Sequence, residues 1–299
     1  MTDDAWFADL DPGDRAAAAD RIREGSAESP ADWPALAVEA GVSADEAEYY
    51  DRLRGATLAA GRAAASEREG AVDQQLVHAV RAMDDCRRQA NELAERVAEW
   101  GGSRFEEAGT GVEYARELSG RDSGSVGVPA SEASGGSSEP RSDGDRQVLA
   151  LARQVVALDE EADALAEYIE TSTPEVAPNL AAMAGPVLAA RLLSLAGGLE
   201  SLAKKPSGTV QVLGAEDALF AHLRGDAPSP KHGVIYTHDA VRGTRSEDRG
   251  SAARALAGKL AIAARVDYYG GDRRPGLQAE LDERIAAIQA RAEGGGGDE

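Results

Sequence analysis

Two long runs of apolar residues, spaced alternately by three and four positions, constrain the fold of this chain most strongly. The first run extends from residue 72 to residue 100, and the second from residue 148 to residue 169. Such heptad spacing places the apolar side chains along one face of a helix, and that face needs a partner helix to cover it. Since one connecting segment joins the runs, the sequence predicts an antiparallel helical hairpin.

The two helices of this hairpin are predicted to differ in length. The helical pattern of the first begins at about Leu58, and its heptad part alone would be about 43 Å long. The second helix is expected to be shorter, so part of the first apolar face would lack a partner, which favours self-association as a homodimer. The residues expected at that dimer interface are Val72, Leu76, Met83, Leu93, Val97, Val148, Leu151, Val155, Leu158 and Leu165.

The segments on either side of the hairpin's first helix are polar. Residues 119–145 are rich in Gly, Ser and acids, a composition that predicts a disordered insertion at the hairpin tip. Residues 1–55 are acidic and carry turn signals, so we expect a small N-terminal unit there. The residue pattern from Leu36 to Tyr50 is similar to that of a helix-turn-helix. However, the acids of its second helix would repel DNA phosphates, which favours a small structural unit over a DNA-binding one.

The composition indicates a mainly all-α protein with an acidic surface. Apolar residues make up 42% of the chain, but aromatic residues only 4%, which favours closely packed helices over a bulky sheet core. The formal net charge is −21, with 53 acids against 32 basic residues. Such a surface is typical of proteins that work in concentrated salt, and we expect a cytoplasmic, haloarchaeal-type protein. A partly disordered acidic protein is the alternative, which the regular apolar spacing argues against.

Several classes of site are disfavoured by the sequence. Cys86 is the only cysteine, which excludes a disulfide or a cysteine-based metal site within one chain. Neither a metal nor a cofactor is expected, since no second histidine or carboxylate lies at ligand spacing from His232 and no glycine-rich loop follows a strand. The apolar span from Leu180 to Leu199 has membrane-spanning length, but a central Arg191 costs about 2.5–3.5 kcal/mol on insertion scales. We therefore expect buried helices and no membrane partner.

Positive charge is concentrated in one part of this acidic chain. From Val176 to Arg274, four lysines and nine arginines exceed nine acids, and these are all the lysines of the protein. Such a basic region suggests a site for an anionic partner, of which a polyphosphate chain is the commonest. The alternative is that these cations only balance local acids.

The same region resembles the Nop domain, the RNA-binding module of the scaffold protein of archaeal box C/D guide ribonucleoproteins. The resemblance covers about a third of the chain closely and extends more loosely back to about Glu67. The matching segments are Pro178-Asn179-Leu180, Gly185-Pro186, Ala190-Arg191-Leu192, Ala196-Gly197-Gly198-Leu199, Leu202-Ala203-Lys204, Gln211-Val212-Leu213-Gly214-Ala215-Glu216, Ala218-Leu219-Phe220, Pro230-Lys231-His232-Gly233 and the run from Arg254 to Asp267.

Within this region, basic and turn-forming residues are the candidate RNA contacts. Small residues after Pro206 would let backbone N–H groups approach phosphates, and a planar His232 could stack on an unpaired base. The alternatives are that His232 is a satisfied structural residue and that Arg265 pairs with Asp267. Stepping at about 100° per residue, Arg254, Lys259 and Arg265 are not expected to share one helix face. The RNA contacts that the resemblance favours are Lys204, Ser207, Gly208, Lys231, His232, Arg254, Lys259 and Arg265.

The resemblance implies four parts: an N-terminal unit (1–55), a coiled-coil hairpin (56–172), a compact helical Nop-like domain (173–272), and a C-terminal helix with a disordered tail (273–299). It implies a non-enzymatic scaffold that binds box C/D guide RNA with a ribosomal-type kink-turn protein, dimerises, and positions the methyltransferase fibrillarin for guided 2′-O-methylation of RNA. In the resembled family an α/β N-terminal domain docks fibrillarin. The short N-terminal segment here leaves open a Nop-domain protein that no longer docks it, and a methyltransferase or a bare coiled-coil protein are further alternatives.

Overall fold

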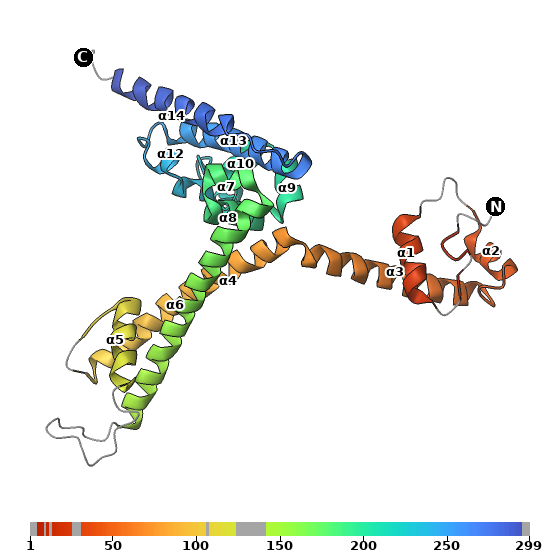
Figure 1. Ribbon diagram of the computed structural model, residues 1–299, viewed down its shortest axis with the longest axis horizontal. Helices are drawn as coiled ribbons and strands as arrows, with labels where there is room; N and C mark the ends of the chain where they lie inside the picture. Colours follow the sequence, from red (N-terminus) through yellow and green to blue (C-terminus); the bar gives the residue numbers. More distant parts are fainter. Residues whose placement is uncertain are drawn as a thin grey trace. The chain divides into compact units, whose positions relative to one another are not determined.

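The computed structural model describes residues 5–8, 10–11, 14–25, 31–105, 108–123 and 142–294. Within these ranges the chain forms α-helices and one short 3-10 helix and no β-strand (Figure 1), so the predicted all-α fold is confirmed. The chain divides into two compact units, Met1–Ala71 and Val72–Glu299.

The first unit consists of α1 (Arg15–Glu24), α2 (Trp33–Glu39) and α3 (Glu46–Gly70). Phe7 and Tyr49 form the centre of its small core, and Trp6 Nε1 donates to Tyr49 Oη at 3.3 Å. The predicted boundary after residue 55 is wrong because it falls inside α3, which is one continuous helix.

The second unit begins with the predicted hairpin, formed by α4 (Val72–Gly102) and α6 (Asp143–Val176). The helix predicted to run from Leu58 is interrupted at Ala71, whose extended backbone (φ −64°, ψ 142°) separates α3 from α4. The second hairpin helix is not the shorter one, since α6 has 34 residues and α4 has 31. No stretch of α4 is therefore left without a partner by a difference in length.

The apolar seam is covered within the chain. Val72, at the start of α4, is 57% exposed, whereas the other seam residues are buried or half-buried in the cores of this unit. Those residues are Leu76, Met83, Leu93, Val97, Val148, Leu151, Val155, Leu158 and Leu165. The expectation that this seam forms a dimer interface is wrong, because packing of α4 against α6 and the following helices already buries it.

A helix that the sequence analysis did not predict packs against the hairpin near its tip. Helix α5 (Gly111–Ser123) contacts both α4 and α6. Tyr114, Ala115 and Leu118 are buried in the core that these helices share. The predicted disordered insertion is thus too wide, since residues 119–123 and 143–145 are helical and residues 124–141 lie outside the described residues.

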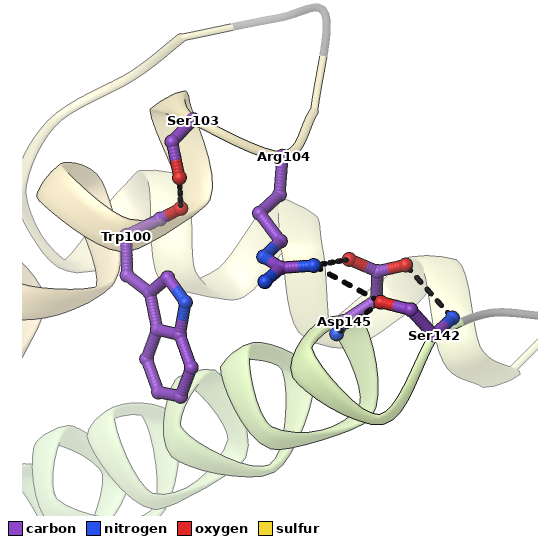
Figure 2. Close-up of polar contacts among 5 residues, drawn as sticks. All are labelled: Trp100, Ser103, Arg104, Ser142 and Asp145. Atoms are coloured by element: carbon purple, nitrogen blue, oxygen red, sulfur yellow. Dashed lines mark hydrogen bonds and ion pairs between the residues drawn. The ribbon is translucent and has the colours of Figure 1, made fainter.

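A polar cluster fixes the start of α6 (Figure 2). The Ser142 hydroxyl accepts from Asp145 N at 3.2 Å, and the Asp145 carboxylate accepts from Ser142 N at 3.0 Å, which is a capping box. Arg104, from the end of the turn after α4, donates to Ser142 Oγ at 3.1 Å and Asp145 Oδ1 at 3.4 Å. Hydrogen bonds from Ser142 and the nearby Arg104 lower the pKa of the Asp145 carboxyl.

The rest of the second unit is a compact module that begins where α6 ends. Pro174 lies inside α6, which ends at Val176, just before Pro178. The module contains α7 (Pro178–Ala184), α8 (Pro186–Ala196), α9 (Leu199–Lys204), α10 (Ser207–Val212), α11 (Glu216–Leu223), η1 (Val234–Thr237), α12 (Asp239–Arg242), α13 (Arg249–Tyr269) and α14 (Gly276–Gly294).

Helix α13 is the centre of this module. It contacts α7, α9, α10, α12, η1 and α14. Its buried side chains are mainly alanines, which let neighbouring helices approach closely. The predicted boundary after residue 272 is wrong, because Leu277, Leu281 and Ile285 of α14 belong to the same core.

Polar contacts join the module to the hairpin. Arg191 of α8 donates to Asp84 of α4 at 2.5 Å, and Leu199 N donates to Asp73 Oδ2 at 2.9 Å. Arg191 is thus paired with a carboxylate of the hairpin. Among the described helices, none alone is long and apolar enough to cross a membrane; α7 and α8 meet that test only as a pair bent by 116°.

A half-buried carboxylate holds the start of the module. Asp267 of α13 accepts from Asn179 N at 3.0 Å, Asn179 Nδ2 at 2.6 Å and Leu180 N at 2.8 Å. It therefore satisfies N–H groups at the beginning of α7, where no local side chain caps the helix. The alternative that Arg265 pairs with Asp267 is wrong, since Arg265 donates to Ala203 O and Lys205 O instead.

We expect Ser142→Ala to lower the free energy of unfolding by about 1 kcal/mol, because it removes the cap of α6. Ser103→Ala, which loses only an exposed hydrogen bond to Trp100 O, should change it by less than about 0.5 kcal/mol. Urea unfolding at neutral pH measures both. Since the folded-state pKa of Asp145 is lowered, its contribution is present at neutral pH and is lost as pH falls through the acidic range.

Asp267→Asn should destabilise the protein by about 1–3 kcal/mol, because an amide offers one acceptor oxygen to three donors. Asp272→Asn is the matched control, since Asp272 uses its backbone carbonyl rather than its carboxylate to bind Asn179. Equal urea midpoints for the two variants would contradict the role assigned to Asp267.

Candidate nucleic-acid interface

The predicted RNA contacts lie at three places around α13 rather than in one cluster. At about 1.5 Å per residue, α13 is ~30 Å long. Lys231 and His232 lie beside its N-terminal end, Arg254 and Lys259 line its side next to α14, and Lys204 lies near Arg265 towards its C-terminal end.

The first place is a basic and aromatic cluster. The His232 ring stacks on Tyr236, with centroids 4.7 Å apart and planes inclined by 25°. The Arg249 guanidinium carbon lies 5.4 Å from the centre of the same Tyr236 ring, within range of a cation–π interaction. Lys231 is exposed, and its stem lies close to Gly250 at the start of α13. Two permanent cations thus lie next to two stacked rings.

The surroundings of His232 favour its neutral form. Its pKa is lowered first by burial and then by the charges of Arg249 and Lys231. A neutral ring stacked on Tyr236 suits base stacking or hydrogen bonding better than charge pairing with phosphate. Its contact with RNA stays a prediction.

The turn that carries Lys231 and His232 is fixed by backbone hydrogen bonds. Gly233 N donates to Gln211 O at 2.8 Å, Val234 N donates to Leu213 O at 2.7 Å, and Gln211 Nε2 donates to Lys231 O at 2.7 Å. A Cβ atom at residue 233 would lie 1.9 Å from Leu213 O. Only glycine therefore allows this close approach, which places the Lys-His pair beside α13.

The second place is the side of α13 that faces α14. Lys259 pairs with Glu280 of α14, whereas Arg254 has no hydrogen bond or ion pair with any described residue. Arg254 and Arg265 are eleven residues apart, or three turns plus about 20°, so these two share a face and the three residues together do not, as the spacing predicts. Lys259 lies about 140° from Arg254, on the α14 side.

The third place is tied together by Arg265. Its Nε donates to Ala203 O and its Nη2 to Lys205 O, both at 3.1 Å, so this arginine satisfies carbonyls at the end of α9. Lys204 Nζ donates to the Glu200 carboxylate, and this hydrogen bond raises the pKa of Lys204. Ser207 and Gly208 are exposed in the first turn of α10 rather than in a loop. Their contact with RNA stays a prediction.

Sequence reasoning missed several residues of this surface. Arg249 and Tyr236 complete the first cluster, and Arg284 of α14 faces Arg254 across a groove. The signal for Arg249 was its position at the start of the predicted basic helix. Nothing in the linear sequence links Arg284 to Arg254, since packing of α14 on α13 brings them together. Within the described residues, no three His, Cys, Asp or Glu side chains are grouped to hold a metal ion.

Comparisons with known proteins match this architecture. A family model described as "Nop: snoRNA binding domain, fibrillarin" matches residues 130–287. An uncharacterized NOP5 family protein of Methanocaldococcus jannaschii is 37% identical over 242 residues, which cover 73% of this chain and 58% of the relative. Nucleolar protein 58 of Schizosaccharomyces pombe is 37% identical over 236 residues, covering 72% and 46%.

The chain spans about half the length of the curated relatives it matches. A solved crystal structure of a fibrillarin/Nop5p complex contains a chain with a similar fold, with a TM-score of 0.50 and 23% identity, covering 95% of this chain and 98% of that one. Because the family model matches more than half of its residues, the chain belongs to the Nop family of proteins, which carry a snoRNA-binding domain.

Proposed function

We propose that this protein is a non-catalytic scaffold subunit of a box C/D guide ribonucleoprotein. It would bind kink-turn RNA together with a ribosomal-type kink-turn protein and position fibrillarin for guided 2′-O-methylation of rRNA or tRNA. The observation that carries the proposal is the match of the snoRNA-binding family model to residues 130–287, which include the basic module around α13.

The cluster of Lys231, His232, Tyr236 and Arg249 supports RNA binding by this module. Guanidinium and ammonium groups contact phosphates, and aromatic rings beside them suit unpaired bases. The rest of the chain is strongly acidic, so an RNA would be repelled elsewhere and directed to this surface. Since phosphate contacts weaken with salt, a second protein that completes the surface would supply affinity that charge alone cannot give.

Binding of fibrillarin is the part of the proposal with a specific alternative. The similar solved chain is in a complex with fibrillarin. However, the described part of the first unit here consists of three helices, whereas the resembled family docks fibrillarin on an α/β domain. This difference favours, as second candidate, a Nop-domain RNA-binding protein that no longer docks the methyltransferase.

A homodimer is a further proposal, and it would not use the heptad seam. The hairpin carries two exposed aromatic side chains at opposite ends, Trp100 at the end of α4 and Tyr168 near the end of α6, which are 40% and 41% exposed. Apolar rings of this size are common at protein interfaces. Sedimentation of the purified chain, compared with Trp100→Ser and Tyr168→Ser variants, tests whether either end of the hairpin forms the dimer.

We expect the full chain to shift a kink-turn RNA on a gel only when the kink-turn protein is already bound. Lys231→Glu and Arg249→Glu should each weaken this shift at least tenfold, because each loses a charge-assisted contact and adds repulsion. Arg88→Glu is the matched control, since Arg88 is an exposed arginine of the hairpin paired with Asp85.

Equal shifts for all three variants, or equal binding of naked duplex RNA, would contradict the proposed RNA-binding role. Pull-down of fibrillarin by the assembled complex distinguishes the two candidates. Retention of fibrillarin supports the complete scaffold, and RNA binding without fibrillarin supports the reduced protein.

A further inference from the structure

A groove runs along the exposed side of α13. One of its walls is α13, and α14 forms part of the opposite wall. The groove consists of three successive hollows of 200, 400 and 330 Å³. Arg254 and Arg284 line both the first and the second hollow, and Ile262 lines both the second and the third. The hollows therefore follow one another along α13, from its start to Tyr269 at its end.

The floor of this groove is formed by small and apolar side chains. Gly258 lies at its middle, and a Cβ atom there would meet nothing within 4 Å. Ala255 and Leu281 lie on either side, where α13 meets α14. A low floor of this kind leaves room for a chain-like ligand along the helix.

Its walls carry an excess of positive charge. Five basic side chains line the three hollows, against three carboxylates, and one of these carboxylates, Glu280, is already paired with Lys259. Arg254 and Arg284 differ from Lys259, because neither has a hydrogen bond or ion pair with any described residue. Two uncommitted guanidinium groups on facing helices can hold one phosphate between them.

An aromatic ring lies at the other end of the groove. Tyr269 is 68% exposed, and its ring is held edge-to-face against Tyr268, with centroids 4.7 Å apart. Such a ring offers an open face for stacking a base, which is available only in unpaired nucleic acid. Fifteen residues of helix separate Arg254 from Tyr269, a distance of about 22 Å that several nucleotides of an extended strand can span.

We infer that this groove binds a single-stranded RNA segment, with a phosphate held between Arg254 and Arg284 and a base stacked on Tyr269. The inference rests on the proposed RNA-binding function and adds to it. It assigns RNA contacts to α14 and to the end of α13, away from the cluster around Lys231 and Arg249. The strand would extend from the structured RNA held by that cluster.

The test measures binding of a labelled short oligouridine to the full chain by fluorescence anisotropy over a series of salt concentrations. Arg284→Gln should weaken binding about tenfold and reduce the slope of log K against log salt by about 0.7, the value for one phosphate contact on a single strand. Tyr269→Ala should weaken binding about tenfold with an unchanged slope, and Tyr269→Phe should restore it. Arg88→Gln, on the hairpin, is the control for loss of an exposed arginine.

Unchanged affinity and slope for Arg284→Gln, or the same loss for Arg88→Gln, would overturn the inference. Circular dichroism melting confirms that each variant is folded. Binding of a blunt kink-turn RNA with the kink-turn protein is measured in parallel. If blunt RNA binds but oligouridine does not, the groove assignment fails alone; if oligouridine binds but blunt RNA does not, the proposed kink-turn function fails and the groove assignment stands.

Discussion

Close packing around the alanine-rich helix α13 is the constraint on which the rest of the module depends. Helices α7, α9, α10, α12 and α14 all contact it. Buried alanines such as Ala257 and Ala261 leave no room for larger side chains and bring neighbouring backbones near. The exposed side of the same helix carries Arg254 and Arg265, so the core and the candidate interface are opposite faces of one element.

The position of each candidate RNA contact follows from this packing. Asp267 binds the start of α7, Arg265 binds the end of α9, and η1 places Tyr236 against Arg249. Since these contacts tie short helices to one long helix, the surface is organised before any RNA arrives. A preorganised surface binds with a smaller entropic cost than one that folds on its ligand.

The sequence predicted the hairpin because heptad spacing is a local signal, and it predicted the helical module through its resemblance to the Nop domain. It did not predict α5, whose Tyr114 and Leu118 lie next to a Gly- and Ser-rich segment that dominates the local composition. The candidate cations were recognisable by type. Their partners were not, because the Lys259–Glu280 and Arg265–Ala203 contacts join residues that are distant in sequence.

The pairing of Lys204 with Glu200 and of Lys259 with Glu280 has a consequence for how a polyanion is released. Each lysine is already paired with a carboxylate of the same chain, so a phosphate that binds there must displace that carboxylate. The phosphate therefore gains less binding free energy than it would from an unpaired lysine. When the nucleic acid dissociates, Glu200 and Glu280 pair with the two lysines again. These two acids would thus lower the affinity for RNA, speed its release and reduce non-specific binding.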